Sequence, residues 1–125
     1  MTPIRPTQFG PPRLPFTPAI KANGFVFVSG QASTDAAGAI AHDTFEAEFR
    51  RSVENVKIIL AADGLTLADV VQVRSYLARQ EDLAEYNRLY REYFNEPYPA
   101  RTTLVGCLGT GSILYEIDVV AVAKS

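Results

Sequence analysis

The sequence predicts an α+β fold in which two helices lie on one face of a mixed sheet. Three observations lead to this class. Two segments carry apolar residues at helical spacing, the other apolar segments are short and strand-like, and their order is strand, strand, helix, strand, helix, strand, strand. The 125 residues, 47% of them hydrophobic, suffice for one core and show no shift in composition, so we expect a single domain over residues 1–125.

The N-terminal segment is rich in proline, since residues 1–18 hold six of the eight prolines. Proline lacks a backbone N–H and fixes φ, so we expect an extended arm here and neither a helix nor a central strand. Leu14 and Phe16 are apolar enough to dock this arm on the rest of the chain, whereas residues 1–10 are equally well interpreted as a loose terminus.

The first strand is expected at Phe25–Val28, a short aromatic and β-branched run that stops at Ser29-Gly30. Turn residues follow over positions 33–38, and residues 39–41 are predicted to form a short edge strand. The Ser29 hydroxyl and the Gly30 amide lie where a ligand can approach the backbone closely, although a plain end of a strand accounts for the pair as well.

The first helix has the clearest pattern in the chain. Asp43 to Glu46 resembles a capping box, in which the Asp43 side chain accepts from first-turn amides and Glu46 reaches back. Gly64 is suited to the left-handed conformation that ends such a helix. Apolar residues recur between these limits at steps of 4, 4, 3 and 4 and form one stripe: Phe45, Phe49, Val53, Val56 and Leu60.

A strand and a second helix follow. Residues 70–77 alternate as a strand, with Arg74 on the side that faces water or an interface. Its other side is assigned to Val71, Val73, Ser75 and Leu77. Residues 82–94 place apolar side chains at helical spacing, namely Leu83, Tyr86, Tyr90 and Tyr93. Such a stripe is more typical of a core than of a cofactor site.

The last two strands are predicted at residues 102–107 and 113–123, separated by a loop that contains Gly109 and Gly111. Both faces of the final strand are largely apolar. In a sheet with helices on only one side, such a strand implies that a partner covers the other side, so we expect an oligomer.

Composition and charge exclude several classes of function. Twelve basic and 14 acidic residues give a net charge of −2 and a pI near 5.3, so no global positive field attracts nucleic acid. No apolar run approaches the ~20 residues that cross a bilayer, and no signal peptide is visible, so we expect a cytoplasmic protein that does not bind membranes. With Cys107 as the single cysteine and His42 as the single histidine, a structural zinc site is excluded.

Two charged residues stand out because their neighbours are apolar. Arg101 opens a predicted strand and Glu116 lies within one, and neither belongs to a run of solvated charge. A partly buried guanidinium needs an anion, while burial of a carboxyl tends to raise its pKa and so allows proton exchange near neutral pH. Two interpretations stay open at this point: a structural Arg101–Glu116 ion pair, or a site for an anionic ligand.

Nucleophilic catalysis is weakly supported. Ser29 lacks a G-x-S-x-G context, and only His42 is available as a histidine base. Cys107 is an alternative nucleophile, but a lone cysteine in a strand is more often a small hydrophobe. The glycine-rich residues 106–111 lack the lysine of a phosphate loop.

Four motifs in this order resemble the Rid family of reactive intermediate deaminases, also called the YjgF family. They are the strand ending in Ser29-Gly30-Gln31, Asn87 in the second helix, Pro99-Ala100-Arg101, and Glu116 in the last strand. Each motif alone is weak, but together they span nearly the whole chain. The resemblance implies a chorismate-mutase-like α+β fold, assembled as a homotrimer whose sheets form a central barrel, with sites between subunits.

The activity that the resemblance implies is hydrolytic deamination of enamines and imines, such as 2-aminoacrylate and 2-iminobutyrate, to 2-keto acids and ammonia. It requires neither a cofactor nor a metal. Arg101 would hold the substrate carboxylate and Glu116 would position the attacking water. The implied substrate-binding residues are Phe16, Ser29, Gly30, Asn87 and Thr103.

Two departures from the family pattern leave the substrate open. Phe16 stands where many deaminating members have tyrosine, and Thr103 where many have cysteine. Pro15-Phe16 is similar to the aminoacrylate deaminases of pyrimidine degradation, which is one alternative, and a non-catalytic module that binds small 2-keto acids is another. A ribonuclease is disfavoured by the acidity and by the lack of a basic patch with interleaved aromatics.

Overall fold

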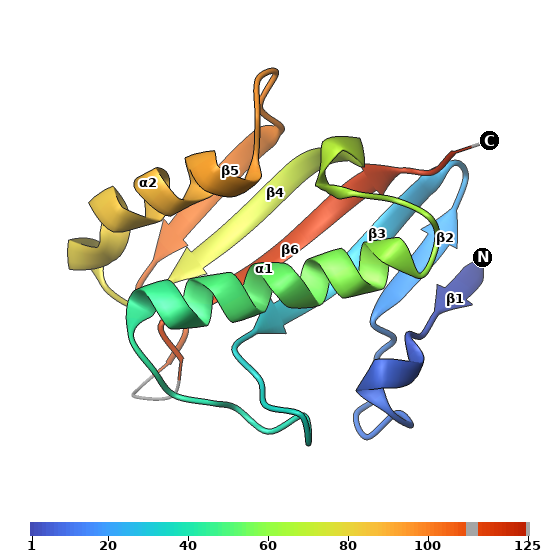
Figure 1. Ribbon diagram of the computed structural model, residues 1–125, viewed down its shortest axis with the longest axis horizontal. Coiled ribbons are helices and arrows are strands. Elements are labelled where there is room, and N and C mark those ends of the chain that lie inside the picture. Colours follow the sequence, from blue (N-terminus) through green and yellow to red (C-terminus); the bar gives the residue numbers. More distant parts are fainter. Residues whose placement is uncertain (110–112, 125) are drawn as a thin grey trace.

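A six-stranded mixed sheet with two α-helices on one face organises the chain in the computed structural model, which describes residues 1–109 and 113–124 (Figure 1). The strands are β1 (Thr2–Ile4), β2 (Ala19–Ala22), β3 (Phe25–Ala32), β4 (Val70–Leu77), β5 (Ala100–Val105) and β6 (Tyr115–Val122). The helices are α1 (Phe45–Ala61) and α2 (Leu83–Tyr93), with 3-10 turns at η1 (Thr7–Phe9), η2 (Leu67–Asp69) and η3 (Gln80–Asp82). The predicted α+β class is confirmed, while Gly111 of the expected glycine loop lies outside the described residues.

The strand order β1-β2-β3-β6-β4-β5 puts the C-terminal strand inside the sheet and β5 at one edge. Neighbouring strands are antiparallel except β4 and β5, which run parallel and are joined through α2. This crossover places α2 on the same face of the sheet as α1, beside β5 (Figure 1). Side chains of α2 contact Arg101 of β5.

The stripe predicted for the first helix forms the centre of the core. Its members are at most 4% exposed, namely Phe45, Phe49, Val53, Val56 and Leu60. Each such burial contributes about 1.5–3 kcal/mol, which holds α1 across β3 and β6 (Figure 1). Gly64 follows the helix with a φ of 74°, the predicted left-handed stop. In the described part of the chain, neither helix is long and apolar enough to span a membrane.

The start of α1 differs from the predicted capping box. Thr44, not Asp43, is the N-cap, and its Oγ1 accepts a hydrogen bond of 3.2 Å from the first turn. Glu48, not Glu46, reaches back: its buried carboxylate accepts from the backbone N–H groups of Asp43 at 3.0 Å and Leu114 at 2.9 Å. Glu48 therefore ties the start of α1 to the segment before β6, a contact between distant parts of the chain that local spacing does not reveal.

The N-terminal arm contributes β1, a strand that its proline content conceals, and β2 follows directly after the arm. β1 pairs with β2 and β2 with β3, so the arm extends the sheet beyond β3. Pro3 is tolerated because β1 is the outermost strand and Pro3 can turn its missing N–H away from the ladder. The predicted edge strand at residues 39–41 is wrong, since this described stretch forms an isolated bridge between Thr34 and Ile40 instead.

Two irregularities change which side chains face the helices. β3 continues past Ser29-Gly30 to Ala32 through a shift in its pairing with β6. A second shift, in β4, turns Val70 inward and leaves Val71 42% exposed, which is the reverse of the predicted assignment. An extra residue in a strand reverses the alternation beyond it, so a simple period of two misplaces such residues.

The face of the sheet opposite the helices is uncovered in the single chain, and part of it is apolar. Phe25, Phe27 and Val122 are 41%, 47% and 42% exposed and lie on the adjacent strands β3 and β6. The prediction that the last strand is largely apolar on both faces holds for its buried side, whereas its outward side carries Glu116 and Asp118 beside Val120 and Val122.

Candidate active site

Arg101 stands on β5, the edge strand to which α2 leads. In the parallel pairing with β4 it lies opposite Val73, which is fully buried, so the arginine is on the helix-covered face. Its guanidinium lies over the rings of Tyr86 and Tyr90, 4.8 Å from each centroid. Stacking of this kind contributes about 0.5–2 kcal/mol and leaves the N–H edges of the guanidinium available for an anion.

The tyrosines beneath Arg101 are fixed by packing. Tyr86 is fully buried, and its hydroxyl is hydrogen bonded at 2.9 Å to Oγ1 of Thr103, which shares the Arg101 face of β5. Tyr90 stacks on Phe94 with 4.5 Å between ring centroids. Burial raises the pKa of Tyr90 well above the ordinary tyrosine value, so its hydroxyl stays protonated. The apolar stripe predicted for the second helix therefore packs in the core as expected, and its residues Tyr86 and Tyr90 also lie beneath the Arg101 guanidinium.

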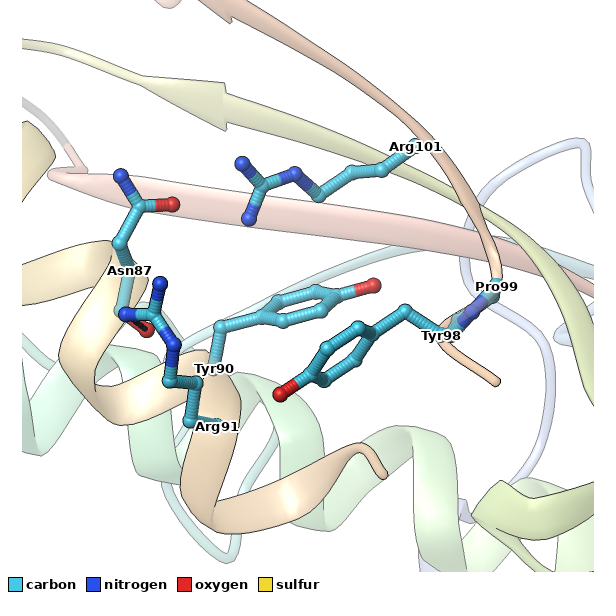
Figure 2. A pocket seen from close by; sticks show the side chains of 6 residues that line it. All are labelled: Asn87, Tyr90, Arg91, Tyr98, Pro99 and Arg101. Atoms are coloured by element: carbon cyan, nitrogen blue, oxygen red, sulfur yellow. Dashed lines mark hydrogen bonds between the residues drawn. The ribbon is translucent and has the colours of Figure 1, made fainter. Parts of the chain in front are cut away.

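A pocket of about 200 Å³ opens beside Arg101 (Figure 2). It is lined by Asn87, Tyr90, Arg91, Tyr98, Pro99 and Arg101. No lining residue is acidic, and Arg101 forms no ion pair with any residue that the structure describes. Two guanidinium groups among neutral polar and aromatic neighbours suit a small anion.

Glu116 on β6 has different surroundings. Its carboxylate lies so close to Gly30 across the β3–β6 pair that a Cβ at position 30 would overlap Oε2. Among the described residues it has neither a hydrogen-bond donor nor an ion-pair partner. Burial, and secondarily the charge of Asp118, raises the pKa of Glu116 above its ordinary value. A carboxyl in this state exchanges protons closer to neutral pH than an exposed one.

The N-terminal arm supports the Glu116 side of the molecule. Ser29 donates from Oγ to the Thr17 carbonyl at 2.6 Å, so its hydroxyl retains only acceptor capacity for a ligand. Its N–H donates to the Pro18 carbonyl at 2.9 Å, which holds the strand just before Gly30. Phe16, 55% exposed, lines a groove of about 640 Å³ together with Gly30.

Arg101 and Glu116 lie on opposite faces of the sheet and do not meet within one chain. Residues paired across adjacent strands share a face. Arg101 pairs with Val73 and Glu116 with Tyr76, and the alternation of β4 directs these two positions to opposite sides. The structural Arg101–Glu116 ion pair is therefore wrong for the single chain.

The predicted site residues divide into two groups that are kept under these names below. The arginine half-site holds Asn87, Arg101 and Thr103. The glutamate half-site holds Gly30 and Glu116, which contact each other, and Ser29, which precedes Gly30 in β3. Phe16 is grouped with them because it lines the same groove as Gly30.

Sequence reasoning missed the aromatic and basic residues that shape the arginine half-site. Tyr86 and Tyr90 are assigned to the core alone, and Arg91 and Tyr98 are not singled out. One pattern points to Arg91, because it follows Asn87 by four residues and so lies on the same side of α2. That β5 returns beside this side of the helix is a tertiary fact without a local sequence pattern.

Cys107, the alternative nucleophile, is not a small hydrophobe within a strand. The predicted strand over residues 102–107 ends at Val105. Gly106 then takes a left-handed φ of 87°, and Cys107 is exposed. It lines neither of the two pockets described above, so it belongs to neither half-site.

Known proteins resemble this chain in sequence. A family model described as endoribonuclease L-PSP matches residues 8–123. A RutC family protein of Pyrococcus horikoshii is 38% identical over 108 residues, 86% of each chain. The 3-aminoacrylate deaminase RutC of Acinetobacter baylyi is 35% identical over 94% of each chain. A 2-iminobutanoate/2-iminopropanoate deaminase of Salmonella typhimurium is 32% identical over 88% of each chain.

Solved structures share the fold. The crystal structure of yeast Mmf1 has a TM-score of 0.88 and 30% identity, covering 98% of each chain. That of E. coli TdcF with bound serine has a TM-score of 0.86 and 26% identity, covering 99% of this chain and 100% of TdcF. The sequence motifs, the fold and these matches agree, and the chain belongs to the endoribonuclease L-PSP family, the Rid or YjgF family that its motifs resemble.

Proposed function

We propose that this protein is a hydrolytic deaminase of reactive enamines and imines, of the 2-aminoacrylate and 2-iminobutyrate type, which it converts to 2-keto acids and ammonia. The arginine half-site carries the proposal. Its guanidinium rests on two tyrosine rings, lacks a carboxylate partner among the described residues, and borders a pocket of about 200 Å³. This arrangement suits a small carboxylate. Two relatives named as deaminases support the reaction class.

The complete site is proposed to form between copies of the chain. The half-sites face opposite ways, so they complement each other only in a head-to-tail contact, and such contacts close into rings when the rotation permits. A homotrimeric ring also covers the apolar face around Phe25, Phe27 and Val122. The arginine half-site of one copy then faces the glutamate half-site of the next.

In this site, Arg101 binds the substrate carboxylate through two hydrogen bonds and so orients the planar imine. Glu116 takes a proton from a water molecule as the water oxygen bonds to the imine carbon, and returns the proton to the nitrogen. The hydroxyl proton of the resulting carbinolamine then also moves to the nitrogen, the C–N bond breaks as the C=O bond forms, and one ammonia leaves for each water consumed. The raised pKa of Glu116 suits a group that takes up and returns a proton.

The other residues of the half-sites position these two groups. Gly30 leaves room for the Glu116 carboxylate beside the backbone, and the Ser29 hydroxyl offers an acceptor to the substrate N–H or to water. Asn87 presents an amide from α2, while Thr103 holds the Tyr86 ring beneath Arg101. Phe16 supplies an apolar wall.

Two alternatives remain as second candidates. The substrate is 3-aminoacrylate if Phe16 marks the RutC type, to which a relative with 35% identity belongs. A module that binds 2-keto acids without converting them would need Arg101 but not a carboxyl with a raised pKa, so Glu116 favours the enzyme.

A coupled assay tests the proposal. A dehydratase generates 2-aminoacrylate from serine or 2-iminobutyrate from threonine, and keto acid release is followed with and without the protein. We expect acceleration by the wild type and a loss of about 100-fold in Arg101→Ala, because a charged two-point contact of about 3 kcal/mol is removed. Arg88→Ala, which removes an ion-paired arginine of the neighbouring helix α2, is the control. No acceleration, with saturable 2-ketobutyrate binding by calorimetry, would instead support the binding module.

A further inference from the structure

A second guanidinium shares the pocket of Arg101. Arg91 lies on α2, one turn after Asn87, and its side chain reaches into the region that Asn87 and Tyr90 also border (Figure 2). Its one hydrogen bond to the described residues runs from Nη1 to the Asn87 carbonyl at 3.2 Å. A guanidinium has five N–H donors in a planar fork, so most of them remain for a ligand.

The pairing of neighbouring arginines makes Arg91 distinctive. Arg88, three residues earlier on α2, lies 3.3 Å from Glu92 and 3.7 Å from Glu46. Arg91 and Arg101 have no carboxylate within ion-pair distance in the described part of the chain. Two uncompensated positive charges therefore border one small pocket, and a single carboxylate on a ligand neutralises only one of them.

We infer that the pocket selects substrates with a second acidic group, namely the imines of dicarboxylic 2-amino acids, with 2-iminosuccinate as the shortest ordinary example. The inference rests on the proposed function, because it assigns Arg101 to the carboxylate next to the imine carbon. Arg91 then binds the distal carboxylate. Pockets for drug-sized ligands measure roughly 300–1,000 Å³. The pocket of about 200 Å³ therefore suits a chain of few carbons.

The step on this substrate balances with water alone. The water oxygen bonds to the imine carbon, both water protons pass to the nitrogen, and the C–N bond breaks as the C=O bond forms. One 2-iminosuccinate and one water therefore give one oxaloacetate and one ammonia. No electrons are transferred and no co-reactant is needed. Arg91 touches only the distal carboxylate and is thus a specificity-determining residue, not a group that moves a proton.

The test compares two imines made in situ by amino-acid oxidases, 2-iminosuccinate from aspartate and 2-iminopropanoate from alanine. The rate of imine loss is measured by trapping with semicarbazide. We expect a higher kcat/KM for 2-iminosuccinate, and a ratio of the two kcat/KM values that falls about tenfold in Arg91→Gln. Arg91→Lys, which keeps the charge, retains part of the ratio. Arg88→Gln, the matched control on the same helix, leaves the ratio unchanged.

Failure of the inference and failure of the proposed function give different results. An unchanged ratio in Arg91→Gln, or no preference for 2-iminosuccinate in the wild type, overturns the inference and leaves the deaminase standing. If neither imine is hydrolysed faster, the deaminase fails, and calorimetry with oxaloacetate and pyruvate decides the inference. Tighter oxaloacetate binding that is lost in Arg91→Gln and kept in Arg88→Gln supports a pocket for diacids, whereas equal binding of both acids overturns it.

Discussion

The two half-sites hold their charged groups in opposite ways. In the arginine half-site, Arg101 is supported by two tyrosine rings and borders an open pocket, so its charge is stabilised and exposed to a ligand. In the glutamate half-site, Glu116 is partly buried beside Gly30, with Asp118 nearby and no described donor, so its ionised form is disfavoured. The surroundings of each group suit a different role. Binding an anion needs a stable cation, whereas proton exchange near neutral pH needs a carboxyl with a raised pKa.

The half-sites also differ in how they are built. The arginine half-site comes from one continuous crossover, α2 to β5, which spans residues 83–105. The glutamate half-site joins the N-terminal arm and β3 to β6 near the C-terminus. A substitution in one half-site should therefore have little effect on the structure of the other half-site in the same copy. The proposed function requires the two half-sites of neighbouring copies to meet.

Mixing two inactive variants is expected to give the largest effect. If each site takes Arg101 from one copy and Glu116 from the next, Arg101→Ala and Glu116→Gln are each inactive alone. Random co-assembly of equal amounts in a ring restores both residues at about one site in four, so we expect about a quarter of wild-type activity. Refolding the mixed chains from denaturant and measuring the deamination rate tests this.

Two samples refolded separately and mixed just before the assay serve as the control for this experiment. They should stay near background unless subunits exchange. A co-refolded mixture that is equally inactive would mean that the site is not divided between copies in the way the two half-sites require.

Gly30→Ala should give the next largest effect. The added Cβ overlaps the Glu116 carboxylate, whose flexible end must move, and displacing a catalytic group by about 1 Å costs up to 100-fold. We therefore expect kcat to fall at least tenfold while the thermal midpoint changes little. Combining Gly30→Ala with Glu116→Asp relieves the overlap and controls for packing. An unchanged kcat in Gly30→Ala would show that catalysis does not depend on this carboxylate position.

A helix or strand could be predicted from the sequence where a single local pattern is enough to specify it. The α1 stripe has a helical period over many residues, and all five of its members are buried as expected. β2 could not be predicted, because Ala19–Ala22 has no distinctive alternation and becomes a strand between partners on both sides. The β4 irregularity that exchanges Val70 and Val71 likewise depends on pairing with β6.

The sequence predicts which residues belong to the candidate site better than it predicts how they are arranged in space. The motifs select Arg101, Glu116 and Gly30, and Gly30 does lie against Glu116. That Arg101 and Glu116 occupy opposite faces depends on the register of β4 against both neighbours, and a shift of one residue would reverse it. Register is set by long-range pairing, which motif spacing does not encode.

Variants of Tyr90 test whether the ring beneath Arg101 supports substrate binding, and we expect a smaller effect, on KM. Tyr90→Leu removes one of the two rings beneath Arg101, so we expect KM to rise about fivefold, equivalent to about 1 kcal/mol, with kcat less affected. Tyr90→Phe keeps the ring and removes a buried hydroxyl that has no hydrogen-bond partner among the described residues. It should keep KM and stabilise the fold by about 1 kcal/mol. Equal KM values for the two variants would show that the Tyr90 ring does not support substrate binding by Arg101.

The smallest expected effect is on stability rather than activity, namely the change that Glu116→Gln makes in how the free energy of unfolding depends on pH. The folded pKa of Glu116 is raised above the ordinary 4.5, so the unfolded chain loses this proton first. Wild-type stability therefore falls as pH rises above about 4.5, and the loss levels off once pH exceeds the folded pKa. The glutamine variant lacks this loss, so its free energy of unfolding in denaturant should match that of the wild type near pH 4 and exceed it at pH 7.5.

Arg101→Gln is the matched variant on the other half-site. It removes the stacking over the two tyrosines, so it should lower stability slightly at both pH values instead of raising it at one. At pH 7.5 we therefore expect Glu116→Gln to raise the free energy of unfolding and Arg101→Gln to lower it. The ionised Glu116 carboxylate destabilises the fold, whereas the stacked Arg101 cation stabilises it. If Glu116→Gln is instead less stable at pH 7.5, the carboxylate has favourable partners in the assembled protein, and the distinction between a binding side and a proton-exchanging side fails.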